Sequence, residues 1–209
     1  MILGYSEELQ KIPAVFVDNL GAIHRVEINK RGDMFIALDA TDVFGERTGY
    51  IRFWVNPNNR FYLSEIYCFN QFRGRGIATF LNDIAEYILK DYEGYIVRGV
   101  FEPAQLSTDK LDNVYCSKEE LYARAIAFYQ KVGYQIITLE DYKKNPEKFF
   151  GINEIEDFQL GEEIADTIVV KVIKKQENYK VREINGVLVH DSYIEAKKTT
   201  PDEVNMGLH

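Results

Sequence analysis

A glycine-containing hexapeptide, Gln71-Phe72-Arg73-Gly74-Arg75-Gly76, separates two apolar stretches of different periodicity. The stretch before it, residues 66–69, is continuously apolar and predicts the end of a strand. The stretch after it repeats apolar residues at helical spacing from 77 to 88, which predicts an amphipathic helix. A strand, a glycine turn and a helix start bring unpaired backbone N–H groups and the positive end of a helix dipole to one point. The sequence therefore predicts a phosphate-binding turn here.

The glycine spacing excludes two common nucleotide fingerprints. Dinucleotide sites use G-x-G-x-x-G after a strand, and nucleoside triphosphate loops use G-x-x-x-x-G-K-[ST]. Here only Gly74 and Gly76 are present, and no Lys-Ser or Lys-Thr pair follows them. The spacing Gln71-x-x-Gly74-x-Gly76 instead resembles the acetyl-CoA pyrophosphate loop of the GNAT superfamily of N-acyltransferases.

A second segment, Ala-Ile-Ala-Phe-Tyr-Gln-Lys-Val-Gly-Tyr at 125–134, resembles the A-I-x-F-Y-x-K-x-G-[FY] segment of the same superfamily. The resemblance spans about residues 48–139. It implies a mixed α/β fold with a central, mostly antiparallel, splayed sheet flanked by helices. Two departures stand out. Tyr122 occupies a position where the family often has Asn, and residues 1–47 indicate strands and turns where the family usually has two helices that wall the acceptor site.

The secondary structure is predicted from periodicity, turn residues and caps. Strands are expected over 14–17, 22–28, 34–38, 50–55, 61–69, 95–101, 134–139 and 167–173, with a polar loop over 39–49. Helices are expected over 76–90 and 121–132; the second follows a capping box at Ser117-x-x-Glu120 and ends at Gly133. Asn185-Gly186 predicts a hairpin between strands 179–184 and 187–193, and a polar, frayed tail begins at Lys197.

A chain of 209 residues, 46% of them hydrophobic, is long enough for one full core with an appendage. We expect a GNAT-like domain over 1–175, with an acidic insertion at 140–166, followed by a hairpin extension and tail over 176–209. The insertion is either a lid over the site or a surface excursion.

The formal net charge of −8 argues against broad nucleic-acid binding, which needs clustered Lys and Arg. No secretion signal and no apolar run of ~20 residues is evident, so a cytoplasmic protein without a membrane segment is expected. Cys68, Cys116 and the three histidines show neither metal-ligand spacing nor a disulfide framework, so no metal is expected.

The resemblance also implies residue roles. The pantetheine arm would pair with backbone groups of the strand before the turn, and the pyrophosphate would meet backbone amides from Arg73 through Ile77, with added contacts from the two arginine side chains. The expected coenzyme-binding residues are Tyr67, Cys68, Phe69, Gln71, Arg73, Gly74, Arg75, Gly76, Ile77, Ala78, Tyr122 and Tyr129.

Moving an acetyl group from a thioester to an amine requires a neutral amine, a stabilised oxyanion and a proton for the departing thiolate. Tyr129 matches the family position whose hydroxyl protonates that thiolate; its plain alternative is core packing. For the amine's proton we expect Glu65, with Glu102 as the substitute; solvated surface residues with proton transfer through water are the alternative. No nucleophile elbow of the form G-x-S-x-G occurs, which favours direct attack.

The sequence therefore predicts an N-acetyltransferase that uses acetyl-CoA, or CoA as its product, and acylates a primary amine of a small molecule or peptide. Its acidity slightly favours a cationic acceptor. Two alternatives stay open: an acyl-CoA-binding module without turnover, and an acetylase of an aminoacyl-tRNA or protein amine. The acceptor pocket would come from the insertion, the C-terminal hairpin or a second subunit, so a homodimer is among the expected assemblies.

Overall fold

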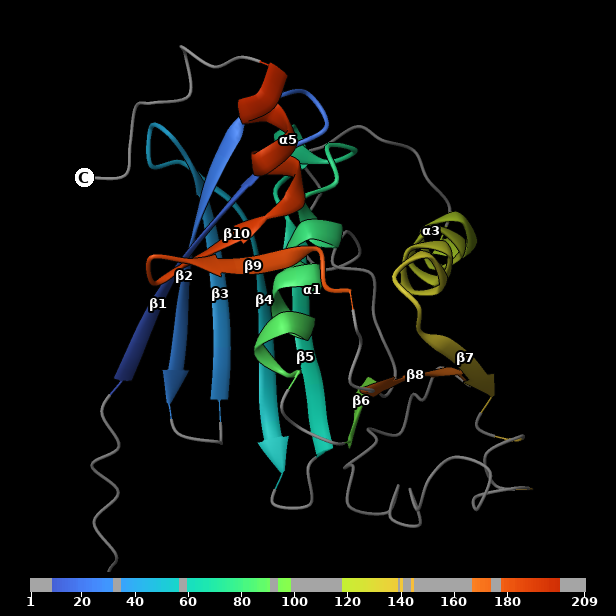
Figure 1. Ribbon diagram of the computed structural model, residues 1–209. Coiled ribbons are helices and arrows are strands. Elements are labelled where there is room, and N and C mark those ends of the chain that lie inside the picture. Colours follow the sequence, from blue (N-terminus) through green and yellow to red (C-terminus); the bar gives the residue numbers. More distant parts are fainter. Residues whose placement is uncertain are drawn as a thin grey trace, which may run out of the picture. The chain divides into compact units, whose positions relative to one another are not determined.

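A computed structural model describes residues 9–31, 35–56, 60–90, 94–98, 118–138, 140, 144, 167–173 and 178–199 (Figure 1). The chain divides into two compact units. The first comprises residues 1–93 and 173–209, and the second comprises 94–172. Within the described residues, no helix combines the length and the apolar character needed to cross a bilayer.

An antiparallel meander forms most of the first unit. Its strands are β1 (Leu9–Val17), β2 (Ile23–Arg31), β3 (Phe35–Asp42), β4 (Arg47–Asn56) and β5 (Arg60–Cys68). Each strand pairs with the next one along the chain. The predicted strands of this region are confirmed, and every one of them lies within a strand of the meander except for its terminal residues.

The predicted loop over 39–49 is wrong for most of its length. Strand β3 continues to Asp42 and β4 starts at Arg47, so only a short turn remains. A loop was predicted here because Asp39, Thr41 and Arg47 are polar. Asp39 and Thr41 alternate with the buried Leu38 and Ala40, and Arg47 precedes the buried Thr48, which is the pattern of strands with one solvated face.

The C-terminal hairpin joins this sheet. Strands β9 (Val181–Ile184) and β10 (Val187–His190) are antiparallel around Asn185-Gly186, as predicted, and β10 pairs in parallel with β1. The sheet order in this unit is β5-β4-β3-β2-β1-β10-β9. After His190 the chain forms helix α5 (Asp191–Thr199), where we had expected continued strand and a frayed tail.

Helix α1 (Ile77–Ile88) covers one face of the sheet and contacts β3, β4, β5, β9 and β10 (Figure 1). It follows a short 3-10 helix, η1 (Asn70–Phe72). The helix buries a stripe of apolar side chains against the strands: Ile77, Leu81, Ile84 and Ala85. Fully burying one such aliphatic side chain stabilises the fold by about 1.5–3 kcal/mol. The helix also comes close to Gly49, where an added Cβ would lie 3.1 Å from Ile77 Cγ2.

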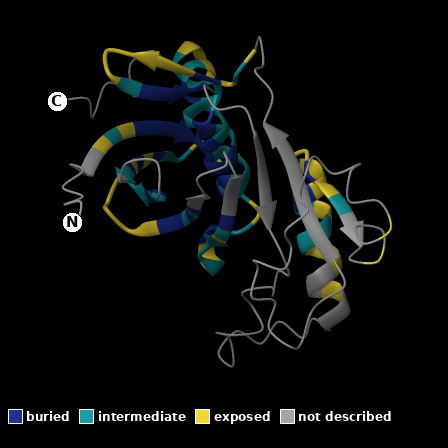
Figure 2. Cartoon of the chain, turned by 90° about the horizontal axis from the view of Figure 1, so that it is seen from below, coloured by how far each residue is buried: buried dark blue, intermediate teal, exposed yellow. Residues whose placement is uncertain are grey.

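The opposite face of the sheet is covered differently at its two ends. Near β1 and β10, helix α5 packs Tyr193 over Val15, Val17 and Val189, which are all buried. Figure 2 shows such buried residues (dark blue) on the inner strands, whereas most of β9 is exposed. Over β2 to β5 this face carries polar and charged side chains.

The second unit contains β6 (Gly94–Arg98), helix α3 (Lys118–Lys131), β7 (Gln135–Thr138) and β8 (Thr167–Ile173). Strands β7 and β8, both predicted as strands, pair with each other antiparallel. Helix α3 starts earlier than residue 121 and ends at Lys131, and Gly133 just beyond it has a φ of 86°, which fits the predicted glycine stop. Ser117 and nearly all of the insertion at 140–166 lie outside the described residues, apart from Glu140 and Lys144.

Candidate functional site

The glycine turn links β5 to α1 by way of η1. Gly74 and Gly76 have φ values of 76° and 87°, in the left-handed region that favours glycine. An added Cβ at Gly74 would have no heavy atom within 4 Å, whereas one at Gly76 would lie 2.9 Å from Asn19 Nδ2. The backbone at Gly74 is therefore open to an approaching ligand, and Gly76 is required by its close contact with the β1–β2 turn.

Helix α1 begins without a cap from its own chain. Gly76 is its N-cap, no side chain accepts a hydrogen bond from its first amides, and its first turn has no acidic residue. The first intrahelical bond runs from Phe80 N–H to Gly76 O at 3.0 Å. Within the described residues, the amides of Gly74, Arg75, Gly76 and Ile77 donate to no other group. Four donors thus lie at the positive end of the helix dipole.

One amide of the expected set is already engaged. Arg73 N–H donates to Asn70 O at 3.2 Å, which closes η1. The set of amides available to a phosphate therefore begins at Gly74, one residue later than the sequence predicted, and continues into the first turn of α1, where Ala78 lies.

The side chains beside the glycines also have partners within the chain. Arg73 Nε donates to Cys68 O at 3.1 Å. The Arg75 guanidinium lies 3.5 Å from Asp18 Oδ2 and 5.1 Å from the centre of the Phe72 ring. Gln71 donates to Glu46 at 2.7 Å. The backbone amides, more than these side chains, are the groups of the turn left for an anion.

The end of β5 presents its backbone alternately to the two sides. Phe69 N–H donates to Thr48 O at 3.1 Å, and Phe69 O accepts from Phe72 N–H at 2.9 Å, so both of its backbone groups are used. Because successive residues of a strand point their N–H and C=O groups in opposite directions, Cys68 faces away from β4, whereas Tyr67 faces β4. Of the three residues expected to pair with a pantetheine arm, Cys68 is thus the one directed away from β4, and because its C=O already accepts from Arg73 Nε, its N–H is the group that suits the arm.

The thiol of Cys68 is not a nucleophile in this environment. Burial, only partly offset by the charges of Arg73 and Arg75, raises the pKa of Cys68 to about 11. A thiol with that pKa stays protonated near neutral pH, and the thiolate is the reactive form.

Glu65 lies on β5, within a predicted strand, on the sheet face opposite α1. Its carboxylate is exposed and accepts a hydrogen bond from the Tyr50 hydroxyl at 2.6 Å. Burial, together with this hydrogen bond and the charge of Glu65, raises the pKa of Tyr50 to about 12. Tyr50 therefore keeps its proton and orients the carboxylate of Glu65.

Three aromatic rings gather beside Glu65. The Tyr50 ring centre lies 5.5 Å from that of Tyr67, and the Tyr67 and Phe69 ring centres are 5.1 Å apart. Guanidinium groups stack on this cluster at cation–π distance: Arg47 and Arg52 on Tyr50, and Arg73 on Tyr67. Tyr50, Arg47 and Arg52 were not predicted from the sequence, because cross-strand neighbours depend on register.

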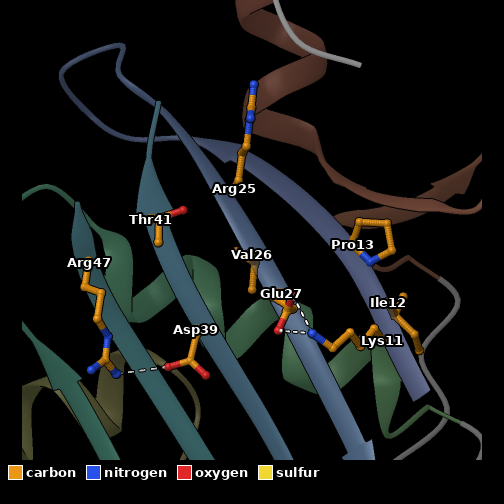
Figure 3. Close-up of a pocket in the computed structure, with 9 residues that line it drawn as sticks. All are labelled: Lys11, Ile12, Pro13, Arg25, Val26, Glu27, Asp39, Thr41 and Arg47. Carbon is orange, nitrogen blue, oxygen red and sulfur yellow. Dashed lines mark hydrogen bonds and ion pairs between the residues drawn. The ribbon is translucent and has the colours of Figure 1, made fainter. Parts of the chain in front are cut away.

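A groove of about 580 Å³ lies on the same sheet face (Figure 3). It is lined by side chains of β1 to β4: Lys11, Ile12, Pro13, Arg25, Val26, Glu27, Asp39, Thr41 and Arg47. Its charged groups pair with one another, Lys11 with Glu27 at 3.2 Å and Arg47 with Asp39 at 3.1 Å. Where the family usually places two helices, the first unit has strands, as residues 1–47 predicted, and this face remains uncovered by α1 and α5.

A buried, hydrogen-bonded Asp–His pair lies behind the glycine turn. Asp18 Oδ2 and His24 Nε2 are 2.9 Å apart, and both side chains are 0% exposed. Burial alone would raise the pKa of the Asp18 carboxyl, but the hydrogen bonds from His24 and from the amides of Ala22 and Leu20 outweigh it and lower the pKa. This pair was not predicted from the sequence. Its only signal was a histidine six residues after a turn aspartate.

The remaining expected residues belong to the second unit or lie outside the description. Tyr129 lies on α3, is 3% exposed and packs its ring against Phe128 and Tyr134. Tyr122 also lies on α3, but its side chain is outside the described residues, as is the whole of Glu102. In the described parts of the chain, no group of three or more His, Cys, Asp or Glu side chains could hold a metal ion.

Comparisons with known proteins identify the family. No match was found among curated proteins. Similar solved structures include a GNAT-family acetyltransferase from Staphylococcus aureus Mu50, with 15% identity and a TM-score of 0.45 over 67% of this chain and 68% of that chain. Another is GCN5 of Tetrahymena, with 14% identity and a TM-score of 0.45 over 71% and 74% of the two chains. A third is the GNAT-family N-acetyltransferase YhbS of Escherichia coli in complex with CoA, with 13% identity and a TM-score of 0.38 over 74% and 66%.

The family model of the acetyltransferase (GNAT) domain matches residues 30–136, just over half of the chain. This span contains the glycine turn and the helix α3 segment that carry the sequence resemblance. The chain therefore belongs to the GNAT family of acetyltransferases.

Proposed function

We propose that this protein transfers an acetyl group from acetyl-CoA to a primary amine of a small molecule or peptide, without a covalent enzyme intermediate. The observation that carries the proposal is the uncapped start of α1, where the amides of Gly74, Arg75, Gly76 and Ile77 donate to no described group. A diphosphate supplies acceptors for all four of them.

The anion chemistry of this turn favours a diphosphate over a neutral ligand. Hydrogen bonds to charged groups contribute about 1.5–3 kcal/mol each, roughly twice the value of neutral ones. The helix dipole adds a favourable interaction with negative charge. The two glycines let the ligand approach the backbone closely, because they lack a Cβ.

The reaction needs no nucleophilic side chain. The neutral amine attacks the thioester carbonyl carbon, the C–S bond breaks, and the departing thiolate takes up a proton. We assign the proton donor to Tyr129 and the acceptor of the amine's proton to Glu65, directly or through water. The high pKa of Cys68 fits direct attack, since its thiol stays protonated and would not accept the acetyl group itself.

The amine acceptor would meet the sheet face opposite α1, beside β5. The rings of Tyr50, Tyr67 and Phe69 supply an apolar surface there, and Glu65 supplies a carboxylate held by Tyr50. An amine bound against this cluster would lie next to the end of β5, where the Cys68 N–H suits the pantetheine arm.

Two measurements on the purified chain test the proposal. Calorimetric titration with acetyl-CoA should give a saturable heat, and release of free CoA thiol should follow addition of members of a panel of small amines and lysine peptides. Binding without thiol release from any amine would favour a coenzyme-binding module, and salt-sensitive tRNA binding with thiol release would favour the aminoacyl-tRNA alternative. If millimolar acetyl-CoA gave no heat of binding, the proposal that this protein uses acetyl-CoA would be wrong.

The assignment of Tyr129 makes a separate prediction. Tyr129→Phe should lower kcat at least about tenfold, within the usual range for a general acid, and leave the Kd for acetyl-CoA within about twofold. Phe128→Leu on the same helix is the control for disturbed packing. If both variants lose the same fraction of turnover, Tyr129 acts by packing and not as an acid.

A further inference from the structure

The hairpin turn between β1 and β2 lies directly against the glycine turn. Asp18 Oδ1 accepts hydrogen bonds from the amides of Leu20 and Ala22, both at 2.9 Å, and Gly21 N–H donates to Asp18 O at 3.0 Å. These bonds shape a rigid turn in which the amide of Asn19 points out of the hairpin. That amide donates to Arg75 O at 3.0 Å.

This bond fixes the orientation of one peptide of the glycine turn. Arg75 C=O and Gly76 N–H belong to the same peptide unit, and no described peptide bond is cis. In a trans peptide the carbonyl and the N–H point in opposite directions. With its carbonyl held by Asn19, the peptide directs the Gly76 N–H away from the β1–β2 turn, toward the uncapped side.

The second oxygen of Asp18 extends the contact into the core. Oδ2 lies 2.9 Å from His24 Nε2 and 3.5 Å from the guanidinium of Arg75. His24 Nδ1 in turn lies 3.1 Å from Thr48 Oγ1, and the carbonyl of Thr48 accepts the Phe69 N–H at the end of β5. One buried network thus reaches both sides of the proposed coenzyme site.

The turn between β3 and β4 is a natural comparison within the same sheet. Asp42 Oδ1 accepts from the amides of Phe44 and Glu46, and Gly45 N–H donates to Asp42 O at 3.1 Å. Gly45 and Gly21 have φ values of 84° and 85°. The local turn is the same, and the residues after the second position, Leu20 and Phe44, are both exposed. The difference is that, within the described residues, the amide of Val43, the counterpart of Asn19, donates to no group.

We propose that the β1–β2 turn is a positioning element for the coenzyme: Asn19, supported by Asp18 and His24, holds the Arg75–Gly76 peptide so that its N–H points at the diphosphate. The inference rests on the proposed function. It assigns Asn19, Asp18 and His24 no contact with the reacting atoms. Their effect is on coenzyme affinity, and they act through the orientation of one peptide.

Matched proline variants test the role of the Asn19 amide. Proline suits the second position of such a turn but lacks the N–H donor. Asn19→Pro should raise the Kd for CoA about tenfold above that of Asn19→Ala, the effect of misdirecting one hydrogen bond to a charged group. Val43→Pro, at the equivalent position of the β3–β4 turn, should leave the Kd within about twofold. Equal Kd values for Asn19→Pro and Asn19→Ala would overturn the proposal.

Hydrogen exchange on the unaltered chain tests the same role without requiring any variant to fold. Addition of CoA should slow hydrogen exchange of the Asn19 amide at least about tenfold, because the coenzyme locks the peptide that accepts its bond. The amide of Gly45, in the β3–β4 turn, should keep its rate. An unchanged Asn19 rate in a chain that binds CoA would contradict the positioning role and leave the proposed function standing, whereas absence of CoA binding would remove the proposed function itself.

Discussion

Two helices of the first unit begin in opposite ways. Helix α5 is closed by its own chain: Ser192 N–H donates to His190 Nδ1 at 3.0 Å, Asp191 N–H donates to Lys180 O at 2.7 Å, and Asp191 adds a negative charge to the first turn. Helix α1 has none of these features, and its preceding turn holds two glycines in the left-handed region.

The difference in capping distinguishes the start of α5, which stabilises the fold, from the start of α1, which is suited to bind a ligand. His190 also lies 3.2 Å from Asp83 on α1, so the start of α5 fastens the C-terminal hairpin to the core. The start of α1 leaves donors unsatisfied, which a stable fold tolerates only where water or a ligand can reach them. The start of α5 shows that this chain can cap a helix. The missing cap at the start of α1 is therefore specific to the proposed binding site.

Placing a carboxylate in the first turn of α1 should cause the largest loss of coenzyme affinity. Ala78→Asp places a carboxylate in the first helical turn, where it competes with the diphosphate. We expect the Kd for acetyl-CoA to rise about a hundredfold, equivalent to ~3 kcal/mol of like-charge repulsion and lost contacts. Without coenzyme, the unfolding free energy should rise by about 0.3–1 kcal/mol, because the charge complements the helix dipole. Ala78→Asn is the uncharged control, and an equal loss of affinity in both variants would indicate crowding instead of charge.

Adding a side chain at the glycine turn should cause a smaller loss of coenzyme affinity. Gly74→Ala and Gly186→Ala carry the same backbone strain, since their φ values are 76° and 78°, and neither added Cβ meets another atom within 4 Å. Each should lower the unfolding free energy by roughly 1–2 kcal/mol. Only Gly74→Ala should also raise the Kd for CoA, by about tenfold, because its methyl group lies where the ligand approaches the backbone. Equal Kd values for the two variants would place the coenzyme elsewhere.

Removing the cap of α5 should lower the free energy of unfolding and leave the affinity for CoA almost unchanged. His190→Ala removes the cap of a buried helix start and should lower the unfolding free energy by about 2 kcal/mol, measured by denaturant titration. His190→Asn keeps a good capping side chain and should lose less than half of that. Below the unfolding transition, both variants should bind CoA within about threefold of the unaltered chain. A large loss of affinity would show that the two helix starts are coupled.

The glycine turn could be predicted from the sequence because its signal is local. A strand, Gly74 and Gly76, and an apolar helical stripe lie consecutively, and each needs only neighbours along the chain. The Asn185-Gly186 hairpin and the Gly133 helix stop were predictable for the same reason. The match of the GNAT family model to residues 30–136 confirms the family inferred from two short segments.

The features that were missed depend on contacts between distant residues. His24 is buried because β1 and β2 bring it onto Asp18 beneath Phe72, and nothing adjacent in sequence marks it as a partner of the glycine turn. Helix α5 follows a strand without a break, and its cap comes from that strand's last residue, His190. The polar residues of β3 and β4 read as a loop because the uncovered face of a sheet is as polar as a loop.

The most direct test of the central claim follows individual backbone amides by NMR while CoA is added. The account predicts that the amide protons of Gly74, Arg75, Gly76 and Ile77 shift downfield as they bond to the diphosphate, while those of Asp191 and Ser192, already bonded within the chain, keep their positions. Saturable CoA binding that leaves the four turn amides unshifted would contradict the account.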